Sequence, residues 1–295
     1  MGRDLFGRDP FADELFECAT EAAGVDLKKL CSRGPSRKLD ETENLQPALA
    51  ALSLALLHRL VEAGVQCDAT AGHSLGELPA LVASGMSNAL DVVELAATRG
   101  RLMGEAASRT PGSMIAVTGL STVEVAAAIE PFKRKGVVSE AAINAPSQMT
   151  ISGDPHLIDE ISGVLGAKSD VRVTRLRVSG AWHSEHMRPA VGPFSKALEA
   201  LEIKAPKVPM LFNRDGREVF GAEQVRERIA GQLERAIRWD KVMGRFMEMG
   251  ITDFVEIGPG KVLRGLVRLN IDDSRINVHN ISDRRSLDRT VETIC

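Results

Sequence analysis

The residues most able to do chemistry surround Ser74, in the run Gly72-His73-Ser74-Leu75-Gly76. A Gly-x-Ser-x-Gly run between a strand and a helix is typical of a nucleophile elbow, a sharp turn that exposes the serine hydroxyl. We expect both glycines to be required, because the turn leaves no room for Cβ atoms. The following helix points backbone N–H groups at the same place, so the amide of Leu75 is a candidate oxyanion donor. The pattern predicts acyl chemistry through a serine ester.

A serine nucleophile needs a base, and the chain contains six histidines. His58 falls inside an apolar helix and His156 follows a proline at an expected helix start, so both suit structural roles. His183 stands in the run Ser179-Gly180-Ala181-Trp182-His183-Ser184, where the chain is expected to return from a small unit to a large one. A residue at that crossing can overhang a cleft, which makes His183 the preferred base.

Segments of helix and strand length alternate along most of the chain, which predicts an α/β architecture. The main expected helices span 11–24, 46–64, 75–85, 222–236 and 239–250, and the main expected strands span 67–71, 209–213 and 253–257. Between residues 111 and 179 the expected order is β-α-β-β-α-β, which is the ferredoxin-like arrangement. We therefore expect a large domain over residues 1–110 and 180–295, with a ferredoxin-like subdomain inserted over 111–179.

Composition excludes several classes of protein. Hydrophobic residues make up 44% and charged residues 26%, and the net charge is −3, which does not suit a nucleic-acid binder. No run approaches the roughly 18 apolar residues that a membrane-spanning helix needs. The four cysteines are far apart and no His or Cys cluster has metal-ligand spacing. We expect a cytoplasmic monomer with reduced thiols, no metal, and no nucleic-acid or membrane partner.

Five ordered blocks carry a resemblance to a known family. They are Gly72-His73-Ser74-Leu75-Gly76-Glu77, Arg99-Gly100-x-x-Met103, Asn144-Ala145-Pro146-Ser147-Gln148, Gly180-Ala181-Trp182-His183-Ser184 and Gly258-Pro259-Gly260-Lys261-Val262-Leu263. Over nearly its whole length the chain resembles the malonyl-CoA:acyl carrier protein transacylases and the acyltransferase domains of fatty acid and polyketide synthases. The resemblance implies an α/β-hydrolase-like large domain with a ferredoxin-like insertion.

The resemblance also implies a ping-pong mechanism. Ser74 would attack the thioester of malonyl-CoA, and His183 would take its proton and later deprotonate the phosphopantetheine thiol of an acyl carrier protein. The backbone carbonyl of Gln232 would orient the imidazole, and Arg99 would bind the malonyl carboxylate. No bound cofactor is implied, since coenzyme A thioester and phosphopantetheine are substrates.

Three further residues are candidates for lining the acyl site. His73 resembles a site-lining histidine, although packing beneath the elbow explains it equally well. Asn144 falls on an expected turn between two strands, where it could face the cleft or serve only as a polar turn residue. Trp182 stands where phenylalanine is commoner and would narrow the acyl pocket if it points inward. The residues beside Ser74 and His183 favour malonyl over methylmalonyl, a discrimination worth only about 1 to 3 kcal/mol.

Carrier proteins are generally acidic, so basic side chains are candidates for docking them. The candidates are Lys133, Arg134, Lys135, Arg175, Arg177, Arg264 and Arg268. The alternative for each is an ordinary solvated surface charge.

One departure from the family pattern concerns the start of the chain. Family members typically begin with a strand that ends in Gly-Gln-Gly-Ser-Gln, whose first glutamine supplies a second oxyanion amide. This sequence begins at the Met1-Gly2 segment that normally follows. We expect either a natural start further upstream, or the loss of a strand and of one oxyanion donor, at a cost of about 10² to 10³ in rate.

Two competing functions remain open at this stage. The elbow also serves serine hydrolases and thioesterases, which would use a late histidine such as His279 with an acidic partner. Arg99 argues against them, because a thioesterase for neutral acyl chains has no use for a buried cation. The other alternative is a non-catalytic member that binds carrier proteins as a scaffold, although intact Ser74, His183 and Arg99 argue against this.

Overall fold

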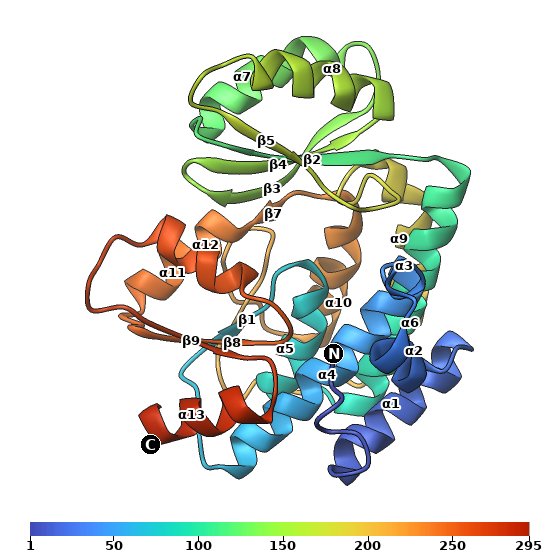
Figure 1. The fold of residues 1–295 in the computed structure, drawn as a ribbon, viewed down its shortest axis with the longest axis vertical. Helices are drawn as coiled ribbons and strands as arrows, with labels where there is room; N and C mark the ends of the chain where they lie inside the picture. Colours follow the sequence, from blue (N-terminus) through green and yellow to red (C-terminus); the bar gives the residue numbers. More distant parts are fainter. Residues whose placement is uncertain (295) are drawn as a thin grey trace.

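The computed structural model describes residues 1–294 and has the expected mixed α/β architecture. A five-stranded sheet covered by two helices forms the upper part of the molecule in Figure 1, above a larger assembly of helices and short strands. Cys295, one of the four cysteines expected to be reduced, lies outside the described residues. Between residues 1 and 294, no helix combines the length and the apolar character needed to cross a membrane.

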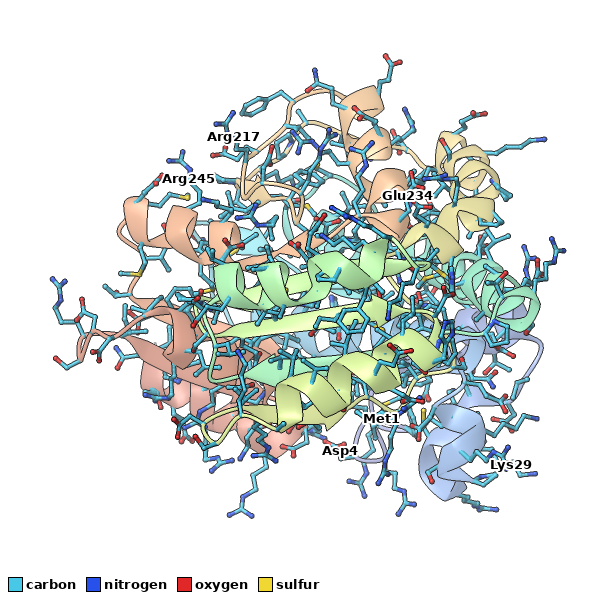
Figure 2. All side chains as sticks on the ribbon, turned by 90° about the horizontal axis from the view of Figure 1, so that it is seen from above. Met1, Asp4, Lys29, Arg217, Glu234 and Arg245 are labelled. Atoms are coloured by element: carbon cyan, nitrogen blue, oxygen red, sulfur yellow. The ribbon has the colours of Figure 1, made fainter. Side chains whose placement is uncertain are left out.

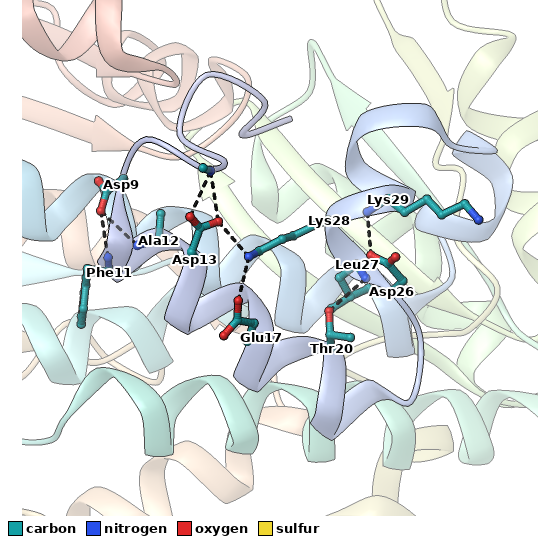
Figure 3. A network of polar contacts seen from close by, with 11 residues as sticks. Asp9, Phe11, Ala12, Asp13, Glu17, Thr20, Asp26, Leu27, Lys28 and Lys29 are labelled. Atoms are coloured by element: carbon teal, nitrogen blue, oxygen red, sulfur yellow. Dashed lines mark hydrogen bonds and ion pairs between the residues drawn. The ribbon is translucent and has the colours of Figure 1, made fainter.

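The chain begins with four helices, α1 (Pro10–Ala23), α2 (Leu27–Arg33), α3 (Ser36–Leu39) and α4 (Thr42–Glu62). The Asp9 carboxylate accepts two N–H groups at the start of α1, and Asp26 accepts the Lys29 N–H at the start of α2. Lys28 bridges from α2 to Asp13 and Glu17 of α1, as Figure 3 shows. These caps and ion pairs fix the N-terminal helices, which pack through α1 against α4.

Helix α6 (Ala89–Arg109) follows the elbow and packs closely on α4. A Cβ added to Gly100 would lie 2.6 Å from the carbonyl oxygen of Thr42, so the two helices approach backbone to backbone at this point. The close approach brings the side chain of Arg99 on α6 next to Gln46 on α4. Helix packing thus determines where this buried cation lies.

Residues 113–175 fold in the predicted order β-α-β-β-α-β. The elements are β2 (Ser113–Thr118), α7 (Thr122–Lys133), β3 (Val138–Ala145), β4 (Gln148–Gly153), α8 (Pro155–Gly166) and β5 (Arg172–Arg175). Figure 2 shows α7 and α8 lying across one face of the sheet, and they enclose a separate apolar core centred on Ile115, Ile151 and Ile161. On this separate core we propose that residues 111–179 form a subdomain inserted between residues 1–110 and 180–295.

The remaining chain completes the lower part of the molecule. Its elements are η2 (Glu185–Met187), α9 (Arg188–Glu199), β6 (Met210–Leu211), α10 (Ala222–Gly231), η3 (Gln232–Glu234), β7 (Ile237–Arg238), α11 (Trp239–Glu248), β8 (Asp253–Ile257), α12 (Val262–Asn270), β9 (Asn277–Ile281) and α13 (Arg284–Ile294). Strand β7 pairs in parallel with β3 and becomes the edge of the five-stranded sheet, in the order β5-β2-β4-β3-β7. The large part of the chain therefore contributes a strand to the sheet of the inserted part.

The other strands form two separate parallel pairs, β1 (Thr70–Ala71) with β6 and β8 with β9. The expected strands at 67–71 and 209–213 are consequently much shorter than predicted, because β1 and β6 match over only two residue pairs. The expected helix over 75–85 also divides into a short 3-10 turn and α5 (Glu77–Ala83). Two helices, α2 and α3, occupy a stretch that the sequence pattern did not predict as helical.

Candidate active site

Ser74 lies on a sharp turn between β1 and the 3-10 turn η1 (Ser74–Gly76). Its φ of 53° falls in the left-handed region, which residues other than glycine rarely adopt. A Cβ on Gly72 would lie 1.8 Å from the carbonyl oxygen of Gly76, so only glycine fits at position 72. Gly76 itself has a helical φ of −58°, and nothing lies within 4 Å of a Cβ added there. The prediction that space requires both glycines is therefore wrong for Gly76.

The structure brings Ser74 and His183 together. The Ser74 Oγ lies 2.8 Å from the His183 Nε2, and the His183 Nδ1 lies 2.8 Å from the backbone oxygen of Gln232. A carbonyl oxygen only accepts hydrogen bonds, so Nδ1 carries the proton and Nε2 is free to accept the proton of Ser74. His183 is buried and has a φ of 60°, which makes it the second non-glycine residue with left-handed backbone.

The surroundings of His183 favour the neutral imidazole. Burial, reinforced by the positive charge of Arg99, lowers the pKa of His183 to about 3. The ring is therefore unprotonated at neutral pH, which is the state a general base requires. Ser74 is only partly buried, whereas His183 and Arg99 beside it are buried.

Arg99 approaches the nucleophile from α6 and is only 2% exposed. Its Nη1 donates to the Gln46 Oε1 at 2.6 Å, and its Nη2 donates to the Gln232 Oε1 at 2.8 Å and lies 3.3 Å from the Ser74 Oγ. Burial lowers the pKa of Arg99 to about 10, and the nearby Glu77 opposes that change. The guanidinium therefore stays charged at neutral pH and presents a cation beside the serine hydroxyl.

Glu77 and Asn213, which like Gln46 were not predicted from the sequence, complete this polar cluster. The Glu77 carboxylate accepts the side-chain amide of Gln232 and the backbone N–H of Asn213 in very short hydrogen bonds. The Asn213 Oδ1 accepts the Ser74 N–H at 2.7 Å, and its Nδ2 donates to the Gly72 oxygen at 2.7 Å. An acidic residue directly after the elbow, at the start of an apolar helix, was the available signal for Glu77. We call the whole group the Ser74 cluster: Gln46, Ser74, Glu77, Arg99, His183, Asn213 and Gln232.

His73 and Asn144 form a second contact beside the elbow. The His73 Nε2 lies 2.9 Å from the Asn144 Oδ1, and the His73 ring packs against Trp239 with centroids 5.4 Å apart. Asn144 belongs to strand β3 rather than to the turn after it, and its Nδ2 also donates to Thr150 at 3.2 Å. Burial lowers the pKa of His73. This pair connects the elbow to the edge of the inserted part.

The other candidates occupy different places. Trp182 packs over Gly180, because a Cβ added to Gly180 would lie 2.4 Å from the indole ring. The amide of Leu75 lies in the first turn of a helix, where backbone N–H groups have no intrahelical acceptor. His279 pairs with Val255 in the β8–β9 ladder, so the histidine beside Ser74 is His183 and not the late one.

The arrangement has what acyl chemistry through a serine ester requires. It combines a partly buried serine, a neutral imidazole oriented by a carbonyl, and a buried cation that could bind a negatively charged acyl group. A separate cavity of about 800 Å³, between the loop at 215–220 and α11, includes none of the residues predicted for the site. No group of three or more His, Cys, Asp or Glu within residues 1–294 could hold a metal ion.

Comparison with known proteins agrees with this geometry. The chain belongs to the acyl transferase domain family, whose sequence model matches residues 1–287. It is 35% identical to the malonyl CoA-acyl carrier protein transacylase of Bacillus subtilis, across 100% of this chain and 92% of that protein. The structure resembles the malonyl transacylase of Streptococcus pneumoniae with a TM-score of 0.90 and 33% identity, over 100% of this chain and 95% of the other.

A further solved structure contains a related enzyme with its partner. It is a malonyl-transacylase in complex with its type II polyketide synthase acyl-carrier protein. The similarity has a TM-score of 0.92 and 31% identity, and it covers 99% of this chain and 94% of the other. The family and the mixed α/β fold expected from the sequence are therefore confirmed.

Proposed function

We propose that this protein transfers the malonyl group from malonyl-CoA to the phosphopantetheine thiol of an acyl carrier protein, in fatty acid or polyketide synthesis. The observation that carries the proposal is the buried guanidinium of Arg99, whose Nη2 lies 3.3 Å from the Ser74 Oγ. A cation so close to the nucleophile suits an acyl group that ends in a carboxylate. The names of the related proteins support the same substrate and acceptor.

In the proposed mechanism, Ser74 attacks the thioester carbonyl while His183 takes the hydroxyl proton through Nε2. The Gln232 carbonyl holds the imidazole through Nδ1, and it stabilises the imidazolium that forms. The Leu75 amide donates to the oxyanion, and the protonated His183 returns its proton to the departing CoA thiolate. His183 then deprotonates the phosphopantetheine thiol, and the thiolate attacks the carbonyl of the malonyl-serine ester. The protonated His183 returns this proton to the departing Ser74 oxygen, which restores the free hydroxyl and the neutral imidazole.

Arg99 would hold the malonyl carboxylate through Nη1 and Nη2. One N–H of each nitrogen already donates to Gln46 or Gln232, and the other N–H is the one that would bind the carboxylate. His73 and Asn144 line the same side of the elbow in the proposal, and their mutual hydrogen bond supports that placement. Trp182 stays a candidate wall of the acyl pocket, from the side of α6. We infer no bound cofactor, since coenzyme A and phosphopantetheine arrive with the substrates.

Charge pairing narrows the surface proposed to dock the carrier protein. Lys133, Lys135 and Arg175 already pair with carboxylates of the inserted part. In the part of the chain that the structure describes, no carboxylate forms a salt bridge with Arg134, Arg177, Arg264 or Arg268, and the last two lie together on α12. The end of α12 reaches the inserted part, where the Asn270 Nδ2 donates to the Asn144 oxygen at 2.7 Å. We propose that an acidic carrier protein docks at α12. The monomeric state and cytoplasmic location stay predictions.

The test is to mix the purified protein with malonyl-CoA and to measure its intact mass. We expect one malonyl adduct, located on Ser74 and absent from Ser74→Ala, that moves to a phosphopantetheinylated carrier protein when this is added. An adduct that water removes at the same rate with and without carrier would favour the hydrolase. A folded protein that forms no adduct but binds the carrier protein would favour the scaffold.

A further inference from the structure

Glu77 has no part in the proposed mechanism, yet it is a carboxylate that is only 2% exposed at the centre of the Ser74 cluster. Each of its oxygens faces one N–H donor: Oε1 faces the Asn213 backbone and Oε2 faces the Gln232 side chain. Burial raises the pKa of Glu77 to about 8, while its hydrogen bonds from Asn213 and Gln232 and the charge of Arg99 oppose that change by favouring the carboxylate. The group therefore needs an explanation beyond helix formation, because its neighbours on α5 are apolar.

The two donors of Glu77 lead to different halves of the site. Asn213 holds the elbow, since its side chain accepts the Ser74 N–H and donates to the Gly72 oxygen, both at 2.7 Å. Gln232 holds the other groups, since its backbone oxygen accepts from His183 and its side-chain oxygen accepts from Arg99, both at 2.8 Å. The Glu77 carboxylate thus connects Asn213, which binds the backbone of Ser74, to Gln232. Gln232 in turn accepts hydrogen bonds from His183 and Arg99.

We propose that Glu77 is a positioning residue that sets the distance and direction between Ser74 and His183 by holding Asn213 and Gln232 at its two oxygens. The inference rests on the proposed acyl transfer and extends it to a residue that touches no reacting atom. Its position also fixes which way the Gln232 amide faces. With Glu77 as an acceptor, the Gln232 NH₂ must face Glu77 and its oxygen must face Arg99.

The positions of donors and acceptors in this network suggest a test. Glu77→Gln keeps the size of the side chain but replaces one acceptor by an NH₂ group, so one of the two donors facing it loses its acceptor. An unsatisfied buried donor costs about 1 to 3 kcal/mol. If Gln232 turns over to compensate, its NH₂ faces the Arg99 guanidinium, which also only donates. Both the loss of an acceptor and the turning of the Gln232 amide would displace Asn213 or Gln232, which hold Ser74 and His183 in place.

The experiment measures kcat and KM for malonyl-CoA, with a phosphopantetheinylated carrier protein as acceptor, together with the melting temperature. For Glu77→Gln we expect kcat to fall about 10- to 100-fold, as that free-energy cost implies, with KM changed less than about threefold. The double variant Glu77→Gln/Gln232→Glu restores a donor–acceptor pair at this contact. We expect its kcat to exceed that of Glu77→Gln by about fivefold, and recovery is incomplete because the Ser74 oxygen loses its donor.

Asp9→Asn is the matched control. Asp9 is another buried carboxylate, at the start of α1 and outside the Ser74 cluster, and it accepts two backbone N–H groups (Figure 3). It also pairs with Arg59. We expect this variant to lower the melting temperature while kcat stays within about twofold of the wild type.

The inference is overturned if folded Glu77→Gln keeps kcat within threefold of the wild type, or if the double variant recovers nothing. Should Glu77→Gln fail to fold, Glu77→Asp decides. Its shorter carboxylate reaches only one of the two donors, so a wild-type kcat for this variant would overturn the inference. A wild-type protein that does not react with malonyl-CoA would instead defeat the proposed function.

Discussion

The Ser74 cluster lies close to the inserted part, residues 111–179, because His73, the residue before Ser74, contacts Asn144 of strand β3. They are held together in different ways. The inserted part consists of a separate apolar core and of antiparallel ladders, in which β2 pairs with β4 and β5 and β3 pairs with β4. The Ser74 cluster depends on single polar contacts between distant residues, such as Ser74 with Asn213 and Ser74 with His183.

The two regions also differ in backbone conformation. The only non-glycine residues with positive φ in the described chain are Ser74 and His183, and both belong to the cluster. Such conformations cost about 1 to 3 kcal/mol each and persist only where the surroundings enforce them. The Ser74 cluster therefore holds two residues in unfavourable backbone conformations, while the inserted part has a regular backbone and an apolar core. Substitutions in the two regions should therefore affect different measurements.

The largest effect on activity is expected from Gly72→Ala. Its Cβ would overlap the Gly76 carbonyl, so the elbow must open and Ser74 must move away from His183. We expect kcat/KM for malonyl transfer to fall by about 10²-fold or more, as for other small displacements of reacting groups. The matched variant is Gly76→Ala, whose Cβ meets no atom within 4 Å.

Because position 76 is helical, Gly76→Ala should keep kcat/KM within about threefold and stabilise the fold by up to about 1 kcal/mol. Steady-state kinetics and thermal unfolding of both variants check this pair. Equal losses of activity from the two variants would contradict the steric account of the elbow.

A smaller effect on activity is expected from acidification. An ordinary imidazole has a pKa of 6.5, but burial and the charge of Arg99 lower the pKa of His183 to about 3. Between pH 7 and pH 5 we expect kcat/KM for Ser74 acylation to show no titration with a midpoint near pH 6.5, because this parameter reports the free enzyme. Rapid-quench intact mass across that range measures it. A loss of half the rate near pH 6.5 would show that His183 is not held neutral.

The same pKa difference affects stability with a defined sign. Between about pH 6.5 and the folded-state pKa near 3, the unfolded chain binds a proton at His183 and the folded chain does not. This histidine therefore contributes to stability above about pH 6.5, and the contribution is lost as the pH falls toward 3.

The smallest effect on activity is expected from Ile151→Ala in the core of the inserted part. Ile151 is fully buried on β4, so the truncation should reduce the free energy of unfolding by about 2 to 5 kcal/mol. We expect kcat of the folded protein to stay within about twofold of the wild type. Val123→Ala on the exposed side of α7 is the control, with a change below about 0.5 kcal/mol. Denaturant unfolding measures both changes in stability. A loss of kcat with unchanged stability in Ile151→Ala would contradict the expectation that this region affects stability and not activity.

Sequence patterns predicted the inserted part well because its order depends on local alternation and turns. The β-α-β-β-α-β order over 113–175 is as expected. The motif around Ser74 predicted the elbow for a similar reason, since Gly72 is required by a contact only four residues away. In both cases the information lies in neighbouring residues.

The rest of the cluster could not be predicted from neighbouring residues. Gln46, Glu77 and Asn213 are polar residues in or beside apolar segments, and only the packing of α4, α5 and β6 reveals their shared partners. The short β1–β6 pair was overestimated because apolar runs indicate burial but not how far a strand overlaps its partner. The direction of the Trp182 side chain could not be predicted either, because its contact with Gly180 depends on the conformation of the turn between them.

Arg99, buried beside Ser74, is proposed to select an acyl group that carries a carboxylate, and a comparison of two acyl donors tests this selection most directly. Rates of Ser74 acylation by malonyl-CoA and acetyl-CoA are measured for the wild type and for Arg99→Ala, and their ratio cancels any difference in the folded fraction.

We expect the wild type to prefer malonyl-CoA, and Arg99→Ala to reduce that preference by about 10²-fold or more, because the carboxylate would then be buried without a partner. An unchanged ratio would contradict the account.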